Sequence, residues 1–187
     1  MARRLILLLG AMATMVVVSA GVALAVAVIG TVNADTCSAL VPPASNFADE
    51  IALAGGNDTC NGLNDADQIS GDSGDDMLSG GNGNDQISGD SGDDMLSGGN
   101  GNDEIYGDSG EDEITGGIGA DDLYGGGGTN VVNGAAGAGD FVSVVDGDPD
   151  DQAAGGTGVS DICVVDDANE AVTVPDPDPC ETVLVAK

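Results

Sequence analysis

The chain has 187 residues with 33 acidic and three basic side chains, a formal net charge of −30, and no histidine or tryptophan. This charge argues against a nucleic-acid partner, because the phosphate backbone would be repelled. Without histidine the chain has no Ser-His or Cys-His pair and no His-ligated zinc, so we predict that it is not an enzyme. An acidic disordered chain fits the composition, but the regular spacing of the aspartates argues against it.

Residues 1–25 have the pattern of a secretory signal peptide. Two arginines precede an apolar run over residues 5–29, and small residues form an A-x-A cleavage site that ends at Ala25, with later options up to Ala34. The apolar run is longer than the roughly 20 residues that span a bilayer, so an uncleaved anchor is the alternative. Both interpretations place the chain from about residue 36 onward outside the cytoplasm. We predict a secreted or cell-surface protein that has no membrane contact after cleavage.

A nine-residue frame repeats from Gly62 to Val142. Each phrase has glycine at the first and fourth places, aspartate at the sixth and an aliphatic residue at the eighth, and residues 71–88 recur as 89–106 with two differences. A short fixed period indicates a solenoid. The last three places alternate polar, aliphatic and polar, which predicts a short strand with one buried face. The glycines permit a tight loop before each strand. We expect the frame to run without insertion.

These phrases resemble the GGxGxDxUx nonapeptide of the RTX (repeat-in-toxin) calcium-binding family. The resemblance implies that each phrase makes a six-residue loop and a three-residue strand, and that two phrases complete one coil. We therefore predict an all-β fold, a parallel β-roll, which is a right-handed solenoid with 18 residues per coil and two calcium-binding loops per coil. The near-identity of the units at residues 71–88 and 89–106 independently supports two phrases per coil.

The predicted domain boundaries follow the frame and the changes of composition around it. The segments are a signal peptide at 1–25 (cleavage as late as 34), an N-terminal cap at 35–52, the RTX-like calcium-binding roll at 53–142, a Gly/Asp/Pro-rich connection at 143–158, and a disulfide-containing C-terminal cap at 159–187.

Four cysteines, Cys37, Cys60, Cys163 and Cys180, lie in the exported part. Their even number suits two disulfides in an oxidising compartment. Three pairings are possible, and proximity in sequence favours Cys37 with Cys60 and Cys163 with Cys180. A zinc site is the alternative, although the chain lacks C-x-x-C spacing and histidine. The D-x-C and C-E-x-V sequences around the last two cysteines also resemble the terminal cap of stand-alone secreted bacterial RTX-like proteins, with Cys163 at an eighth place.

In a roll with this coil length, the sixth-place aspartates form two rows with about 4.8 Å between neighbours. Bare carboxylates at this spacing repel, whereas a divalent cation between them would convert the repulsion into attraction. Oxygen ligands without nitrogen or sulfur select Ca²⁺ over Mg²⁺. We predict about six calcium sites, each shared by two coils. The ligands are Asp58, Asp76, Asp94 and Asp112 in one row, and Asp67, Asp85, Asp103 and Asp121 in the other.

Calcium occupancy is expected to fade after Tyr124. There Asn130 replaces the sixth-place aspartate and Gly139 vacates the next one, so a site between residues 112 and 130 would be weak. Because the unfolded chain holds no preformed site, the free energy of calcium binding becomes free energy of folding.

The sequence favours a secreted calcium-binding β-roll that folds on binding several Ca²⁺ ions outside the cell and has a structural or calcium-sequestering role. The alternative is a calcium-dependent extracellular adhesin, or a module that binds glycans or ice through an outward ladder of Asn64, Asn82 and Asn100. The sequence indicates no specific protein partner and no cofactor other than calcium.

Overall fold

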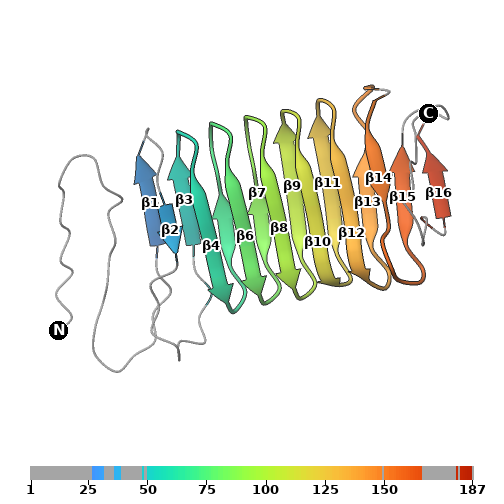
Figure 1. Ribbon diagram of the computed structural model, residues 1–187, viewed down its shortest axis with the longest axis horizontal. Coiled ribbons are helices and arrows are strands. Elements are labelled where there is room, and N and C mark those ends of the chain that lie inside the picture. The colour runs from blue at the N-terminus through green and yellow to red at the C-terminus, as the bar shows by residue number, and fades with distance from the viewer. Residues whose placement is uncertain are drawn as a thin grey trace.

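The computed structural model describes residues 27–31, 36–38, 48, 50–148, 150–165, 180 and 182–186, and for 27–31 and 36–38 it describes the backbone alone. The regular elements in these ranges are all β-strands. They stack along one long axis, with β1 and β16 at opposite ends (Figure 1). Within the described ranges there is no helix, and so none with the length and hydropathy to cross a membrane. The predicted signal peptide or anchor lies outside the described residues, apart from 27–31.

The strands form two parallel sheets, and successive strands along the chain from β2 to β15 alternate between them. The nine-stranded sheet has the spatial order β1 (Ala27–Thr31), β3 (Glu50–Ala54), β5 (Gln68–Ser70), β7 (Gln86–Ser88), β9 (Glu104–Ser109), β11 (Asp122–Gly127), β13 (Phe141–Val144), β15 (Ile162–Val165), β16 (Thr182–Val185). The seven-stranded sheet has the order β14 (Gln152–Ala154), β12 (Val131–Gly137), β10 (Glu113–Gly119), β8 (Met95–Asn100), β6 (Met77–Asn82), β4 (Thr59–Asn64), β2 (Thr36–Ser38).

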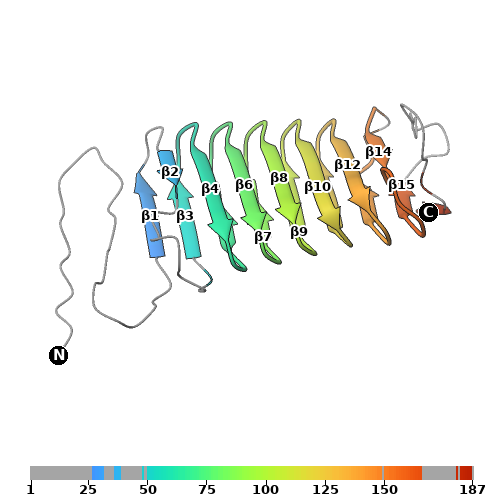
Figure 2. The same ribbon diagram turned by 60° about the horizontal axis from the view of Figure 1, so that its bottom comes forward.

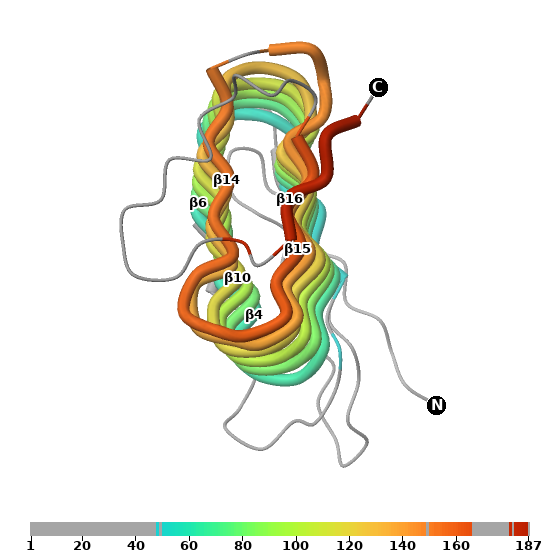
Figure 3. The backbone as a smooth tube through the Cα atoms, turned by 90° about the vertical axis from the view of Figure 1, so that its right-hand side faces the viewer, coloured from blue at the N-terminus to red at the C-terminus, as the bar shows by residue number. Residues whose placement is uncertain are grey.

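The register repeats every 18 residues through the middle of the stack. Ile69 pairs with Ile87 in one sheet, and Leu78 pairs with Leu96 in the other. Seen down the long axis, the successive turns superpose as a flattened coil (Figure 3), and a tilted view separates the strands of the seven-stranded sheet (Figure 2). The fold is the predicted parallel solenoid, a β-roll in which two phrases make one turn.

The core is a double column of the eighth-place side chains. Ile87 and Ile105 from one sheet, and Leu96 and Ile114 from the other, are at most 1% exposed. The seventh- and ninth-place side chains between them face outward, as strand alternation requires. Two aliphatic side chains per turn contribute roughly 1.5–3 kcal/mol each, against about 1–2 kcal/mol of backbone entropy for every ordered residue. Additional interactions must hold the turns together.

The prediction of an uninterrupted frame to Val142 is wrong. Val142 pairs with Leu123 rather than with Tyr124, so the turn that leads to β13 contains one extra residue. The narrow core explains the shift, because it takes the β-branched Val142 inside and leaves Phe141 outside against the ring of Tyr124. Longer turns then lead to β14 and β15. The strands of the roll thus continue through part of the stretch that the sequence assigns to a connection.

The predicted disulfide between Cys163 and Cys180 is present, with 5.7 Å between the two Cα atoms. Cys163 is buried at an eighth place, as predicted, and it pairs with Val142. Cys60 is also disulfide-bonded, and the register places Cys37 opposite it. The side chain of Cys37 lies outside the described residues, so its pairing with Cys60 stays a prediction.

Candidate metal centre

The eight predicted ligands lie in two rows inside the roll. Each sixth-place aspartate ends a loop and directly precedes a strand, and period-two alternation turns it to the same side as the eighth-place core residue. Each is at most 2% exposed although it carries a carboxylate. The row beside the seven-stranded sheet contains Asp58, Asp76, Asp94 and Asp112, and the row beside the nine-stranded sheet contains Asp67, Asp85, Asp103 and Asp121.

One oxygen of these carboxylates joins neighbouring turns. The Oδ1 atom of Asp94 accepts the backbone N–H of Asp76 at 2.8 Å, and Oδ1 of Asp112 accepts that of Asp94 at 2.9 Å. The other row repeats the contact, with 2.8 Å from the N–H of Asp85 to Oδ1 of Asp103. Each bond spans 18 residues, so the carboxylates fix the stacking of the loops one turn at a time.

The second oxygen of these carboxylates has no donor. The Oδ2 atoms of Asp76, Asp85, Asp94, Asp103, Asp112 and Asp121 are buried without a hydrogen-bond partner in the structure. A buried charged oxygen in this state is strongly destabilising. A regular series of such atoms, one in each successive loop, indicates that the loops are built around a positively charged group.

The first-place glycines reveal a small oxygen-lined space beside each Oδ2. A Cβ atom added to Gly89 would overlap Oδ2 of Asp94 and lie 2.9 Å from the carbonyl oxygen of Gly107, one turn further on. Gly71 faces Asp76 and the carbonyl of Gly89 in the same way. Carboxylate and carbonyl oxygens thus share a cradle that a methyl group would fill. This set of hard oxygen donors fits Ca²⁺.

Three or more Asp, Glu, Cys or His side chains do not gather around one point anywhere in the described part of the chain. A calcium ion shared by two turns would have one row carboxylate from each turn as a ligand. The rest of its shell of six to eight oxygens would come from loop carbonyls and water. Sharing each ion between two turns agrees with the cross-turn position of the carbonyl oxygens of Gly89 and Gly107.

Burial raises the pKa values of carboxylates in both rows toward neutral pH. Desolvation raises the pKa of Asp94 to about 7, the backbone N–H of Asp76 opposes part of the rise, and the carboxylates of Asp112 and Asp76 add to it. Desolvation likewise dominates at four further positions in the rows. It raises the pKa values of Asp76, Asp103, Asp112 and Asp121 to about 6.

Three further aspartates lie in the rows. The sequence placed Asp161 at a sixth place, whereas Asp140 and Asp151 were not predicted. Asp140, Asp151 and Asp161 are each at most 1% exposed and continue the rows. Oδ1 of Asp140 accepts the N–H of Asp121 at 2.9 Å, and Oδ1 of Asp161 accepts that of Asp140 at 3.0 Å. The expectation that Gly139 vacates the sixth place is therefore wrong, since Asp140 fills it. The missed signal for Asp140 and Asp151 was an aspartate two places before a buried apolar residue, as in D-F-V and D-Q-A.

Second-place aspartates in the loops beside the seven-stranded sheet join neighbouring turns at the surface. Asp72 and Asp90 are second-place residues with φ near +70°, and Oδ2 of Asp72 accepts the N–H of Ala54 at 3.0 Å. The hydroxyl of Ser70 donates to Oδ2 of Asp90 at 2.7 Å. These carboxylates lie outside the rows and already have protein donors, so they are poorer candidates for ion ligands.

The predicted ladder of asparagine side chains is present at the C-terminal ends of β4, β6 and β8 in the seven-stranded sheet. The side-chain amide of Asn82 donates to Oδ1 of Asn64 at 2.9 Å, and that of Asn100 donates to Oδ1 of Asn82 at 2.6 Å. Ile118, which is 61% exposed, occupies the next position and ends the ladder. The three amides therefore use some of their hydrogen-bond donors and acceptors to bind one another.

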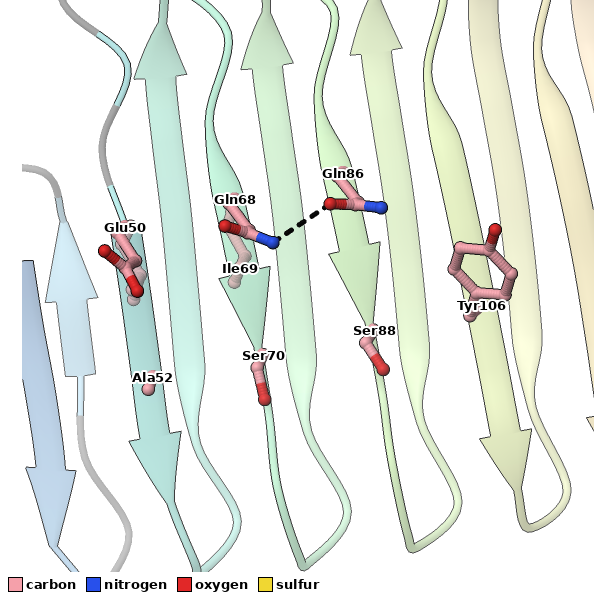
Figure 4. A pocket seen from close by; sticks show the side chains of 9 residues that line it. Glu50, Ala52, Gln68, Ile69, Ser70, Gln86, Ser88 and Tyr106 are labelled. Atoms are coloured by element: carbon pink, nitrogen blue, oxygen red, sulfur yellow. Dashed lines mark hydrogen bonds between the residues drawn. The ribbon is translucent and has the colours of Figure 1, made fainter.

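A shallow groove of about 340 Å³ lies on the outer face of the nine-stranded sheet. Figure 4 shows the amides of Gln68 and Gln86 along it, joined by a 3.0 Å hydrogen bond, with Ser70 and Ser88 beside them and Tyr106 at one end. The lining also contains the carboxylate of Glu50 and apolar residues such as Ala52, and it includes no sixth-place aspartate.

A comparison with protein families decides between a generic acidic solenoid and a known class. The model of the RTX calcium-binding nonapeptide repeat (HemolysinCabind) matches residues 44–140 through five overlapping segments. The chain belongs to this RTX family. The RTX repeat supports calcium as the ligand of the two aspartate rows, and its matched segments end at Asp140, where the register shifts. No curated protein and no solved structure matches the chain in the other two comparisons.

The cradle predicts a sharp effect of Gly89→Ala. The new methyl group would displace Oδ2 of Asp94 from the carbonyl of Gly107, so we expect fewer calcium ions bound and a higher calcium concentration at half-saturation. Gly127→Ala is the matched control, because its Cβ would meet only ordinary contacts at 3.8 and 3.9 Å. Isothermal titration calorimetry measures both variants. Equal calcium binding by the two would contradict the proposed cradle.

The raised pKa values predict that the metal-free roll loses stability as the pH rises. Asp94 titrates at about 7 in the fold but has an ordinary value of 3.8, so the folded state binds protons more tightly than the unfolded chain. This stabilisation is complete below about pH 4 and is lost as the pH passes through about 6 to 7. Circular dichroism of calcium-free protein from pH 4 to 8 should show decreasing β-structure. Increasing β-structure would contradict this prediction.

Proposed function

We propose that the chain is a secreted calcium-binding β-roll that folds on binding several Ca²⁺ ions outside the cell, where it has a structural or calcium-sequestering role. The observation that carries this proposal is the series of buried Oδ2 atoms without donors. Membership of the RTX family supports the choice of calcium.

Without metal ions the folded chain has two energetic penalties. Its thin core leaves the turns poorly held, and the carboxylates inside them either repel or must hold protons. Calcium removes both penalties at once, and because the unfolded chain has no site, each bound ion stabilises the folded state. Extracellular calcium modules have dissociation constants of about 10⁻⁴–10⁻³ M. Sites in that range would stay empty in the cytosol and fill after export.

The proposed ions lie between successive aspartates of each row. The pairs are 58/76, 76/94, 94/112, 67/85, 85/103 and 103/121, and the continued row adds 121/140 and 140/161. A catalytic role finds no support, because the chain contains no histidine and its buried carboxylates face calcium cradles.

Export is proposed from the N-terminal pattern, and the structure favours the earlier cleavage site. Strand β1 begins at Ala27 and pairs with β3, so cleavage after Ala25 leaves the strand intact whereas cleavage after Ala34 would remove it. Mass spectrometry of the exported product should therefore give an N-terminus at Val26. Detection of a product that starts at Asp35, or of an uncleaved chain in the membrane, would contradict this assignment.

A glycan- or ice-binding role is the second candidate. The aligned amides of Asn64, Asn82 and Asn100 favour it, since they repeat at the spacing of the turns. The ladder has only three members before Ile118, which makes the candidate weaker than calcium sequestration. A glycan array and an ice-affinity assay of the calcium-loaded protein would discriminate between the two roles.

Calcium-dependent folding can be tested with neighbouring aspartates of the same loop. Titration of the metal-free protein with calcium should increase β-structure in circular dichroism, and magnesium should be less effective. Asp94→Asn should shift the transition to higher calcium. Asp93→Asn, which removes the same charge from an exposed position, should leave it nearly unchanged. A spectrum insensitive to calcium, or equal shifts for both variants, would contradict the proposal.

A further inference from the structure

Asn130 occupies the position of a ligand aspartate in the row beside the seven-stranded sheet. It is fully buried, and its Oδ1 atom accepts the N–H of Asp112 at 3.0 Å, as the aspartates do for their neighbours. A Cβ atom added to Gly125 would lie 3.1 Å from Nδ2 of Asn130, whereas the equivalent point at Gly107 overlaps Oδ2 of Asp112. The amide nitrogen therefore stands where the other loops have the carboxylate oxygen that lacks a donor.

The hydrogen bonds fix the orientation of this amide. Because a backbone N–H donates to one of its atoms, that atom must be the oxygen and the other must be the NH₂ group. The NH₂ group donates to the carbonyl oxygens of Gly126 at 3.2 Å and Gly128 at 3.0 Å. These are the second- and fourth-place carbonyls of its own loop. Both donors of Asn130 are thus used inside the loop.

The NH₂ group of this amide places positive partial charge next to the loop carbonyl oxygens, as a cation would in the aspartate loops of the row. In the aspartate loops Oδ2 and the carbonyl oxygens all carry negative partial or full charge, so they repel one another unless a proton or a cation lies between them. In the Asn130 loop two N–H groups point at the carbonyl oxygens, and no charge is buried.

We infer that the loop of Asn130 needs no calcium, because the side-chain amide of Asn130 takes the place of the metal ion. This inference rests on the proposed calcium binding and specifies where it stops. In the row beside the seven-stranded sheet, Asn130 interrupts the series of ions between Asp112 and Asp151. The other row continues past the same level through Asp121 and Asp140. The two rows of the roll therefore hold unequal numbers of ions.

The direct test is Asn130→Asp in the exported protein, with bound calcium counted by calorimetry and equilibrium dialysis. Restoring the carboxylate should add at least one calcium ion per chain. The matched control is Asn102→Asp, which adds the same charge at an exposed asparagine whose Oδ1 also accepts a backbone N–H from the next turn. The control should leave the stoichiometry unchanged.

The outcomes separate this inference from the proposed function. A wild-type protein that binds no calcium would overturn the proposed function itself. Binding by the wild type with no gain in Asn130→Asp, or with an equal gain in Asn102→Asp, would overturn the inference alone.

A converse variant covers failure of Asn130→Asp to fold. Asp94→Asn places a second amide in the row, so without calcium this variant should keep more β-structure in circular dichroism as the pH rises from 4 to 8 than Asp93→Asn does. Loss of β-structure at the same pH in both variants would show that an amide does not replace the ion.

Discussion

The structure depends on one electrostatic constraint, namely that every turn buries a carboxylate oxygen against oxygens of its own and the next turn. Oδ2 of Asp94 beside the carbonyl of Gly107 is the repeating example. Neither atom can donate a hydrogen bond, so the contact is repulsive unless a proton or a cation enters it. The same carboxylate uses Oδ1 to hold the backbone of Asp76. Folding, pH response and metal binding are therefore coupled at a single side chain per loop.

The other repeated features of the nine-residue frame follow from this contact. Glycine at the first place leaves the space in which the oxygens converge, since a methyl group at Gly71 or Gly89 would fill it. The aliphatic eighth place gives each turn a narrow apolar column, too small to hold the roll alone. The chain also has interactions that need no metal. These are the disulfide between Cys163 and Cys180 near the C-terminal end, and the stacked rings of Tyr106 on β9 and Tyr124 on β11, whose centroids are 4.8 Å apart.

Much of this arrangement could be predicted from the sequence, because the 18-residue period determines which residues lie next to each other in successive turns. The spacing of Asp76 and Asp94 predicts stacked rows, and the aliphatic residues two places later predict the core. The register shift at Asp140 could not be predicted, because the glycines keep their period there while the core selects Val142 over Phe141. The sequence also marks Asn130 as a weak ligand. Only the hydrogen bonds of its amide reveal that it satisfies the loop without an ion.

The most direct measurement is anomalous diffraction from crystals grown with calcium. Peaks should lie beside Oδ2 of the aspartates in both rows, between successive turns, and the loop of Asn130 should contain none. Peaks confined to the exposed acids such as Asp72 and Asp90, with the buried carboxylates hydrogen-bonded to water or to one another, would contradict the account.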